Sequence, residues 1–120
     1  MKVKGIVWLG SPTDRFDDMM RFATDVLGLK ARQQAPDFAV FELEDGDIFE
    51  IFGPRAVADA HEFMKAPVAG FRVDNVAAAR EEMERKGVLF IGPVHRSDRG
   101  GGWSHFFGPD GHVYEITSRG

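Results

Sequence analysis

Two glutamates and one histidine are the residues of this sequence most suited to chemistry. Glu50 and Glu115 each lie four residues after an Asp-Gly pair, in the segments DIFEI and HVYEI. A carboxylate in an apolar cavity has a raised pKa, which suits it to accept a proton near neutral pH. His105 can transfer protons, donate a hydrogen bond or bind a metal ion. The alternative for the glutamates is exposure to solvent or pairing with an arginine such as Arg72.

The composition excludes several other kinds of chemistry. The 120-residue chain has no cysteine, which excludes disulfides, thiolate nucleophiles and cysteine-bound metal sites. Its formal net charge of −4 argues against binding to nucleic acids or anionic membranes, because both attract basic surfaces. No apolar run approaches the roughly 18 residues of a membrane span, and the first residues do not resemble a signal peptide. We therefore expect one cytoplasmic domain.

The segments that must position these residues occur twice in the chain. Each glutamate lies in the second of two alternating segments joined by an Asp-Gly turn, which is the pattern of a β-hairpin. The spacing between the two glutamates also relates Phe38 to Trp103 and Phe41 to Phe106. The repeat therefore includes both strands of each hairpin.

A strand-like segment and a helical pattern precede each hairpin. The strand-like segments are residues 3–9 and 68–73. The expected helix ends are Thr13 or Asp14 with Gly28 for the first helix, and Asp74 or Asn75 with Gly87 for the second. Each half is thus predicted to form a β-α-β-β-β module, at residues 1–53 and 68–120, with a linker at 54–67. The predicted fold class is α+β; the alternative is one ferredoxin-like sandwich with a coincidental Asp-Gly echo.

Three segments resemble the vicinal oxygen chelate superfamily, which includes glyoxalase I, bleomycin-resistance proteins, methylmalonyl-CoA epimerase and extradiol dioxygenases. FATDVLGL at 22–29 is similar to the family's FYxDxLGL, and GPDGHVYEI at 108–116 is similar to its DPDGNxxEL. FRVDN at 71–75 is similar to its FxVDD. The resemblance covers nearly the whole chain. It implies two tandem modules forming a curved mixed sheet around a cavity, often completed in a homodimer.

The resemblance also implies a metal position that this sequence does not reproduce. In enzymes of the superfamily, the first and last strands of each module supply the side chains that bind the ion. The last-strand positions carry Glu50 and Glu115. The first-strand positions, usually His or Gln, fall on Val68 and on either Trp8 or Val7. None of these three side chains binds a metal, and two carboxylates alone hold divalent ions weakly, so no metal cofactor is predicted.

Aromatic residues are expected to line the predicted cavity. Period-2 alternation places Trp103 and Phe107 on the same strand face as His105, and Phe106 on the face that packs under a helix. Aromatic walls with a few polar groups are typical of sites for flat organic molecules. The candidate ligand-binding residues are Trp103, Phe38, Phe107, Arg72, Trp8 and Val68, with Arg72 reaching a ligand carboxylate or a glutamate. His61, His95 and His112 are expected at exposed positions in the linker, a loop and the rim.

Two classes of function agree with these features. The first is a metal-free binding protein, similar to bleomycin-resistance proteins, that holds a small aromatic molecule in the cavity of a homodimer. The second is an enzyme of the isomerase, epimerase, lyase or dioxygenase-like kind. In such an enzyme Glu115, Glu50 or His105 acts as the acid or base, or these three residues together hold a divalent ion. The missing first-strand ligands favour the binding protein, and a purely structural role leaves the repeated glutamates unexplained.

Overall fold

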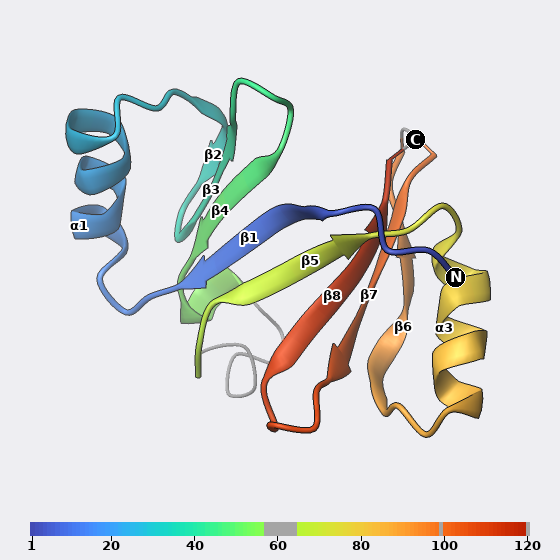
Figure 1. Cartoon of the computed structure of the whole chain (residues 1–120). Helices are drawn as coiled ribbons and strands as arrows, with labels where there is room; N and C mark the ends of the chain where they lie inside the picture. Colours follow the sequence, from blue (N-terminus) through green and yellow to red (C-terminus); the bar gives the residue numbers. More distant parts are fainter. Residues whose placement is uncertain (57–64, 99, 120) are drawn as a thin grey trace. The chain divides into compact units, whose positions relative to one another are not determined.

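The computed structural model describes residues 1–56, 65–98 and 100–119 (Figure 1). The chain divides into two compact units. The N-terminal unit is Val7–Val68, and the C-terminal unit combines Met1–Ile6 with Ala69–Gly120. Part of the linker, including His61, lies outside the described residues. Each unit contains the elements of one β-α-β-β-β module.

The N-terminal unit has a mixed sheet in the order β2-β3-β4-β1. The hairpin strands pair antiparallel, and β1 pairs with β4 in parallel. The Asp-Gly turn between β3 and β4 has Gly46 at φ +89°, a conformation that favours glycine. The elements of this unit are β1 (Ile6–Pro12), α1 (Phe16–Arg21), the π-helical η1 (Phe22–Val26), β2 (Ala31–Ala35), β3 (Phe38–Glu42), β4 (Ile48–Phe52) and the 3₁₀ turn η2 (Pro54–Ala56).

The C-terminal unit repeats this plan in the order β5-β8-β7-β6. Here β5 and β8 are parallel, and the other neighbouring strands are antiparallel. The elements of this unit are β5 (Val68–Arg72), α3 (Val76–Arg85), β6 (Phe90–Arg96), β7 (Gly102–Phe107) and β8 (Val113–Ser118). The mixed parallel and antiparallel strand pairing, together with the helices, confirms the predicted α+β class.

The helix of the C-terminal unit begins and ends as the sequence predicted. The Asn75 side chain accepts a 2.9 Å hydrogen bond from the backbone N–H of Ala78, which satisfies one of the free donors of the first turn. Gly87 follows the helix at φ +92°. The apolar positions of the predicted stripe are all buried: Val76, Ala79 and Met83.

The start of the N-terminal module differs from the prediction in two respects. Neither Thr13 nor Asp14 caps α1, because the Thr13 hydroxyl instead accepts from the backbone N–H of Arg15 in a turn before the helix. The first strand begins at Ile6 rather than at residue 3. Lys4 and Gly5 form backbone hydrogen bonds with Arg72 on β5, and these bonds assign the first residues to the C-terminal unit.

Each sheet packs one face against its own helix. In the C-terminal unit Phe106 and Ile116 form a core with residues of α3, which confirms the predicted direction of Phe106. In the N-terminal unit Ala23 packs with Phe41 and Ile51. Because side chains alternate along a strand, neighbouring residues point to the opposite face of each sheet. Among the described helices, none is long and apolar enough to cross a membrane.

Candidate functional site

A buried histidine–glutamate pair lies on the face of the C-terminal sheet opposite α3. His105 on β7 is directly opposite Glu115 on β8, and Nε2 lies 2.9 Å from Oε1. The side chains are 14% and 6% exposed, respectively. Burial raises the pKa of Glu115, and the contacts with His105 and the charge of His95 offset only part of that rise. The pair can therefore hold a proton and exchange it with a bound molecule.

An aromatic stack lies beside this pair on the same sheet face. Trp103 precedes His105 by two residues on β7 and is opposite His95 on β6. Their rings stack with centroids 5.3 Å apart and planes inclined by 19°. Phe107, also on this face, pairs with Val113 on β8. This Trp103–His95 stack supplies a flat apolar surface next to two polar groups.

The position of His95 corrects the sequence analysis, which placed this residue in a loop. His95 is exposed, as expected, but it belongs to β6. The register between β6 and β7 shifts between Ile91 and His95, and Gly92 has φ +68°. Such an irregularity accommodates Pro93 without ending the strand. The hairpin register, which depends on this irregularity, is what brings His95 opposite Trp103.

In the N-terminal unit, a tryptophan holds the equivalent glutamate. The indole Nε1–H of Trp8 donates a 2.9 Å hydrogen bond to Glu50 Oε2, and both residues are half-buried. A Cβ atom added to Gly10 would lie 2.3 Å from Cη2 of Trp8. The indole therefore occupies the space that a side chain at position 10 would fill. Because Gly10 has no side chain, the indole of Trp8 can reach Glu50.

The strand registers decide which first-strand residues are equivalent in the two modules. Gly10 pairs with Glu50, and Gly70 pairs with Glu115. Counting two residues back from each glycine gives Trp8 and Val68. The equivalent of Val68 is therefore Trp8 and not Val7, a choice that the sequence left open.

The metal ion that the superfamily resemblance implies does not fit these residues. The indole of Trp8 is a hydrogen-bond donor without a metal-binding lone pair, and Val68 has no polar atom. The Trp8 N–H also occupies one oxygen of Glu50. Within residues 1–56, 65–98 and 100–119, no group of three or more histidine or acidic side chains is placed to hold a metal ion. The chemistry available here is that of carboxylate, imidazole and indole groups.

The structure brings the predicted site residues together in two sets, one in each unit. Arg72 pairs with Thr117 on β8, in the C-terminal set that also contains Glu115 and His105. In the N-terminal set, Phe38 pairs with Phe52, on the same β3–β4 hairpin as Glu50. The full sets are Glu115, His105, Trp103, Phe107 and Arg72 in the C-terminal unit, and Glu50, Trp8 and Phe38 in the N-terminal unit. Val68 is the first residue of β5 and lies at the boundary between the two units.

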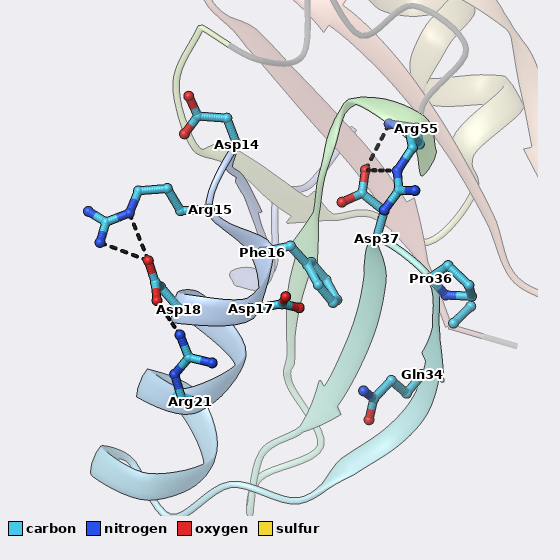
Figure 2. Close-up of a pocket in the computed structure, with 11 residues that line it drawn as sticks. Asp14, Arg15, Phe16, Asp17, Asp18, Arg21, Gln34, Pro36, Asp37 and Arg55 are labelled. Carbon is cyan, nitrogen blue, oxygen red and sulfur yellow. Dashed lines mark hydrogen bonds and ion pairs between the residues drawn. The ribbon is translucent and has the colours of Figure 1, made fainter.

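An open pocket of about 830 Å³, which the sequence analysis did not predict, lies at the start of α1 (Figure 2). Arg15 donates from Nε to Asp18 at 2.9 Å, and Arg21 also pairs with Asp18. Across the pocket, the Asp37 carboxylate accepts a 2.8 Å hydrogen bond from the backbone N–H of Arg55. These side chains largely satisfy one another, so the pocket is a weaker candidate than the Glu115 pair.

Comparison with known proteins agrees with the module architecture. The model of the Glyoxalase/Bleomycin resistance protein/Dioxygenase superfamily matches residues 5–116. The chain resembles methylmalonyl-CoA epimerase from Mycobacterium tuberculosis at 16% identity with a TM-score of 0.73, covering 98% of this chain and 89% of that chain. It also resembles the Mn(II)-bound glyoxalase from Novosphingobium aromaticivorans at 23% identity with a TM-score of 0.73. That likeness covers 98% of this chain and 39% of the other.

A third similar structure is a glyoxalase/bleomycin resistance protein/dioxygenase superfamily member from Vibrio splendidus 12B01. It is 13% identical with a TM-score of 0.68, covering 92% of this chain and 95% of that one. No protein of curated function matches significantly. Likeness at these identities shows a shared fold, and activity must be argued from the site. The family model spans nearly all of the sequence, and the chain therefore belongs to the Glyoxalase/Bleomycin resistance protein/Dioxygenase superfamily.

Proposed function

We propose that this protein binds a small, flat organic molecule on the sheet face that carries His105 and Glu115, and that it does so without a metal ion. The observation that supports this most strongly is the buried pair beside the Trp103–His95 stack. Sites for small molecules commonly combine aromatic surface with a few fixed polar groups. Phe107, on the same face of the same unit, is proposed as a further ligand contact.

We propose a metal-free site because of the chemistry of the first-strand residues. Trp8 and Val68 offer no ligand atom, and the indole N–H of Trp8 competes for Glu50. Elemental analysis of purified protein, before and after incubation with Mn, Fe, Ni and Zn salts and desalting, tests this part. We expect no retained metal. Near-stoichiometric metal would contradict the proposal and make Glu50, Glu115 and His105 the first ligands to test.

Ligand binding is tested with a panel of aromatic carboxylates, amides and phenols, measured by thermal shift and isothermal titration. We expect at least one compound to raise the melting temperature of the wild-type protein. Substituting Trp103 by Ala should weaken its binding, because the stack loses its larger ring. Replacing Phe22, an exposed aromatic residue of η1, by Ala is the control and should leave binding unchanged. Equal affinity in the Trp103→Ala protein would contradict this site.

A proton-transfer enzyme is the second candidate, favoured by the buried Glu115 with its raised pKa. The solved structures that this chain resembles include a methylmalonyl-CoA epimerase and a glyoxalase. In this candidate, the ionised carboxylate of Glu115 accepts a proton from a substrate carbon next to a carbonyl group. The nearby His105 Nε2 stabilises the charged form by hydrogen bonding.

The Glu115→Gln substitution distinguishes the two candidates, because Gln keeps the shape and can still accept a hydrogen bond from His105 but cannot take up a proton. For a catalytic base, we expect turnover to fall by a factor on the order of 10²–10⁴. For a binding residue, affinity should fall by only about 1–3 kcal/mol. Glu81→Gln, on the exposed side of α3, is the matched control.

The superfamily resemblance also supports the proposal that the protein is a homodimer. Light scattering coupled to size exclusion measures the mass of the particle in solution. A mass of twice 13.4 kDa is expected, and a monomer mass at all concentrations would contradict this proposal.

A further inference from the structure

The strand registers place Arg72 next to the pair and the stack described above. β5 pairs with β8 so that Gly70 is beside Glu115 and Arg72 is beside Thr117. Thr117 is in turn opposite Trp103, and Trp103 is opposite His95. One row across the C-terminal sheet is therefore Arg72, Thr117, Trp103 and His95. The adjacent row contains Glu115 and His105.

The side chain of Arg72 points to the same face as this pair. Its neighbours Phe71 and Val73 both pack in the core cluster with α3, on the other face of the sheet. Alternation along β5 therefore turns Arg72 away from the helix. Its backbone is fixed, because Lys4 N–H donates to the Arg72 carbonyl and Arg72 N–H donates to the Gly5 carbonyl, both at 2.8 Å.

The guanidinium of Arg72 is available for a ligand. Arg72 is partly buried, and no described side chain forms a hydrogen bond or ion pair with it. Asp74, two residues after the end of β5, pairs with Lys4 Nζ at 2.5 Å, and the charge of Arg72 lowers the pKa of Asp74 less than Lys4 does. A guanidinium presents a planar fork of N–H donors that matches a carboxylate. Because the guanidinium lies on the same face as the Trp103–His95 stack, the two together would suit a ligand with both a carboxylate and an aromatic ring.

We propose, on the basis of the ligand-binding function above, that the ligand is a flat aromatic carboxylate held at one end by Arg72 and stacked at the other on Trp103. Two strand spacings, roughly 10 Å, separate the backbones of these residues, a gap that an arginine side chain and a two-ring acid together can span. Thr117, between them, is small, and its hydroxyl donates to the Gly102 carbonyl at 3.2 Å. In this proposal the ligand lies over Thr117, between Arg72 and Trp103.

The acid on this face is compatible with an anionic ligand. Glu115 is buried and contacts His105, and burial favours its neutral form. It therefore repels a carboxylate less than an exposed glutamate would. His95 lies at the other end of the row that begins with Arg72.

The test compares naphthoate with its neutral amide, naphthamide, by isothermal titration at pH 7. The wild-type protein should bind naphthoate about tenfold to hundredfold more tightly than naphthamide, the range of a charge-assisted hydrogen-bond pair. Arg72→Gln should lose this preference while its affinity for naphthamide stays within about twofold. Arg85→Gln, an exposed arginine in the last turn of α3, is the matched control and should keep the preference.

The outcomes separate this inference from the function on which it rests. If the wild-type protein binds both probes equally, or Arg72→Gln keeps the preference, the role of Arg72 is wrong and aromatic binding still stands. If the folded wild-type protein binds neither probe, both proposals are contradicted. Arg72→Met, which keeps the apolar stem of the side chain, is the second variant and replaces Arg72→Gln if that protein does not fold.

Discussion

The indole N–H of Trp8 donates a 2.9 Å hydrogen bond to Glu50, whereas the equivalent glutamate of the second module, Glu115, contacts the imidazole of His105. The two glutamates occupy the same place in the repeat but have partners of different chemistry. An indole N–H does not titrate, but an imidazole does. Of these two contacts, only the one in the C-terminal module joins two groups that can both take up a proton.

Replacing Trp8 by Phe should destabilise the protein by about 1–3 kcal/mol, because a half-buried carboxylate oxygen of Glu50 loses its donor. Urea unfolding measures the change in the free energy of unfolding. Trp103→Phe is the control, because stacking on His95 tolerates another aromatic ring. If Trp8→Phe and Trp103→Phe lower the free energy of unfolding by the same small amount, the Trp8–Glu50 hydrogen bond does not contribute to stability.

Adding a methyl group at Gly10 should force the indole of Trp8 away from Glu50. The new Cβ would lie 2.3 Å from the Trp8 ring and 2.9 Å from the ring of Phe52. We expect Gly10→Ala to cost about 1–3 kcal/mol. In a double-mutant cycle with Trp8→Ala the loss should shrink, because the obstructing ring is gone. If the losses in the free energy of unfolding from Gly10→Ala and Trp8→Ala are fully additive, the Trp8 ring does not pack against Gly10 as described.

The pH dependence of stability should carry a contribution from Glu115. Burial raises its pKa in the folded state above the ordinary value of 4.5, so the folded protein holds the proton more tightly than the unfolded chain. The stabilisation is fully present below the unfolded pKa and is lost as pH rises through the folded pKa. The hydrogen bond from His105 and the charge of His95 lower the pKa of this carboxyl group and limit the size of the effect.

Urea unfolding of the wild-type protein and of Glu115→Gln across pH 4–8 measures this contribution. The wild-type free energy of unfolding should fall relative to that of the variant as the pH rises above about 4.5. A constant difference across this range would show that the carboxyl pKa is not raised. Glu81→Gln, exposed on α3, should follow the wild-type curve.

Gly53 should not tolerate a side chain. A Cβ there would lie 2.1 Å from Oδ1 of Asp37, a buried residue at φ +64° whose carbonyl accepts from Gly53 N–H. Gly53→Ala is therefore expected to cost about 2 kcal/mol or more in urea unfolding. Asp37→Asn should cost less, because Asn also adopts positive φ. A larger loss for Asp37→Asn would instead point to the carboxylate charge as the critical feature.

Local patterns in the sequence determined the modules and the directions of their side chains. The Asp-Gly turns lie at Gly46 and Gly111, both at positive φ, and Asn75 caps α3. Period-2 alternation placed Phe106 toward the helix and His105 toward the opposite face. These features depend on residues close together in the chain, and the duplication supplied each pattern twice.

Only the tertiary structure decided which side chains meet across strands. The Trp8–Glu50 hydrogen bond requires the parallel register of β1 and β4, and the Trp103–His95 stack requires the irregular register of β6 and β7. The late start of β1 follows from backbone pairing of the first residues with Arg72. Strand register results from many distant contacts that must be satisfied together, so a shift of one residue changes every partner. The sequence thus determined which residues could do chemistry, and the strand pairing decided which of them do it together.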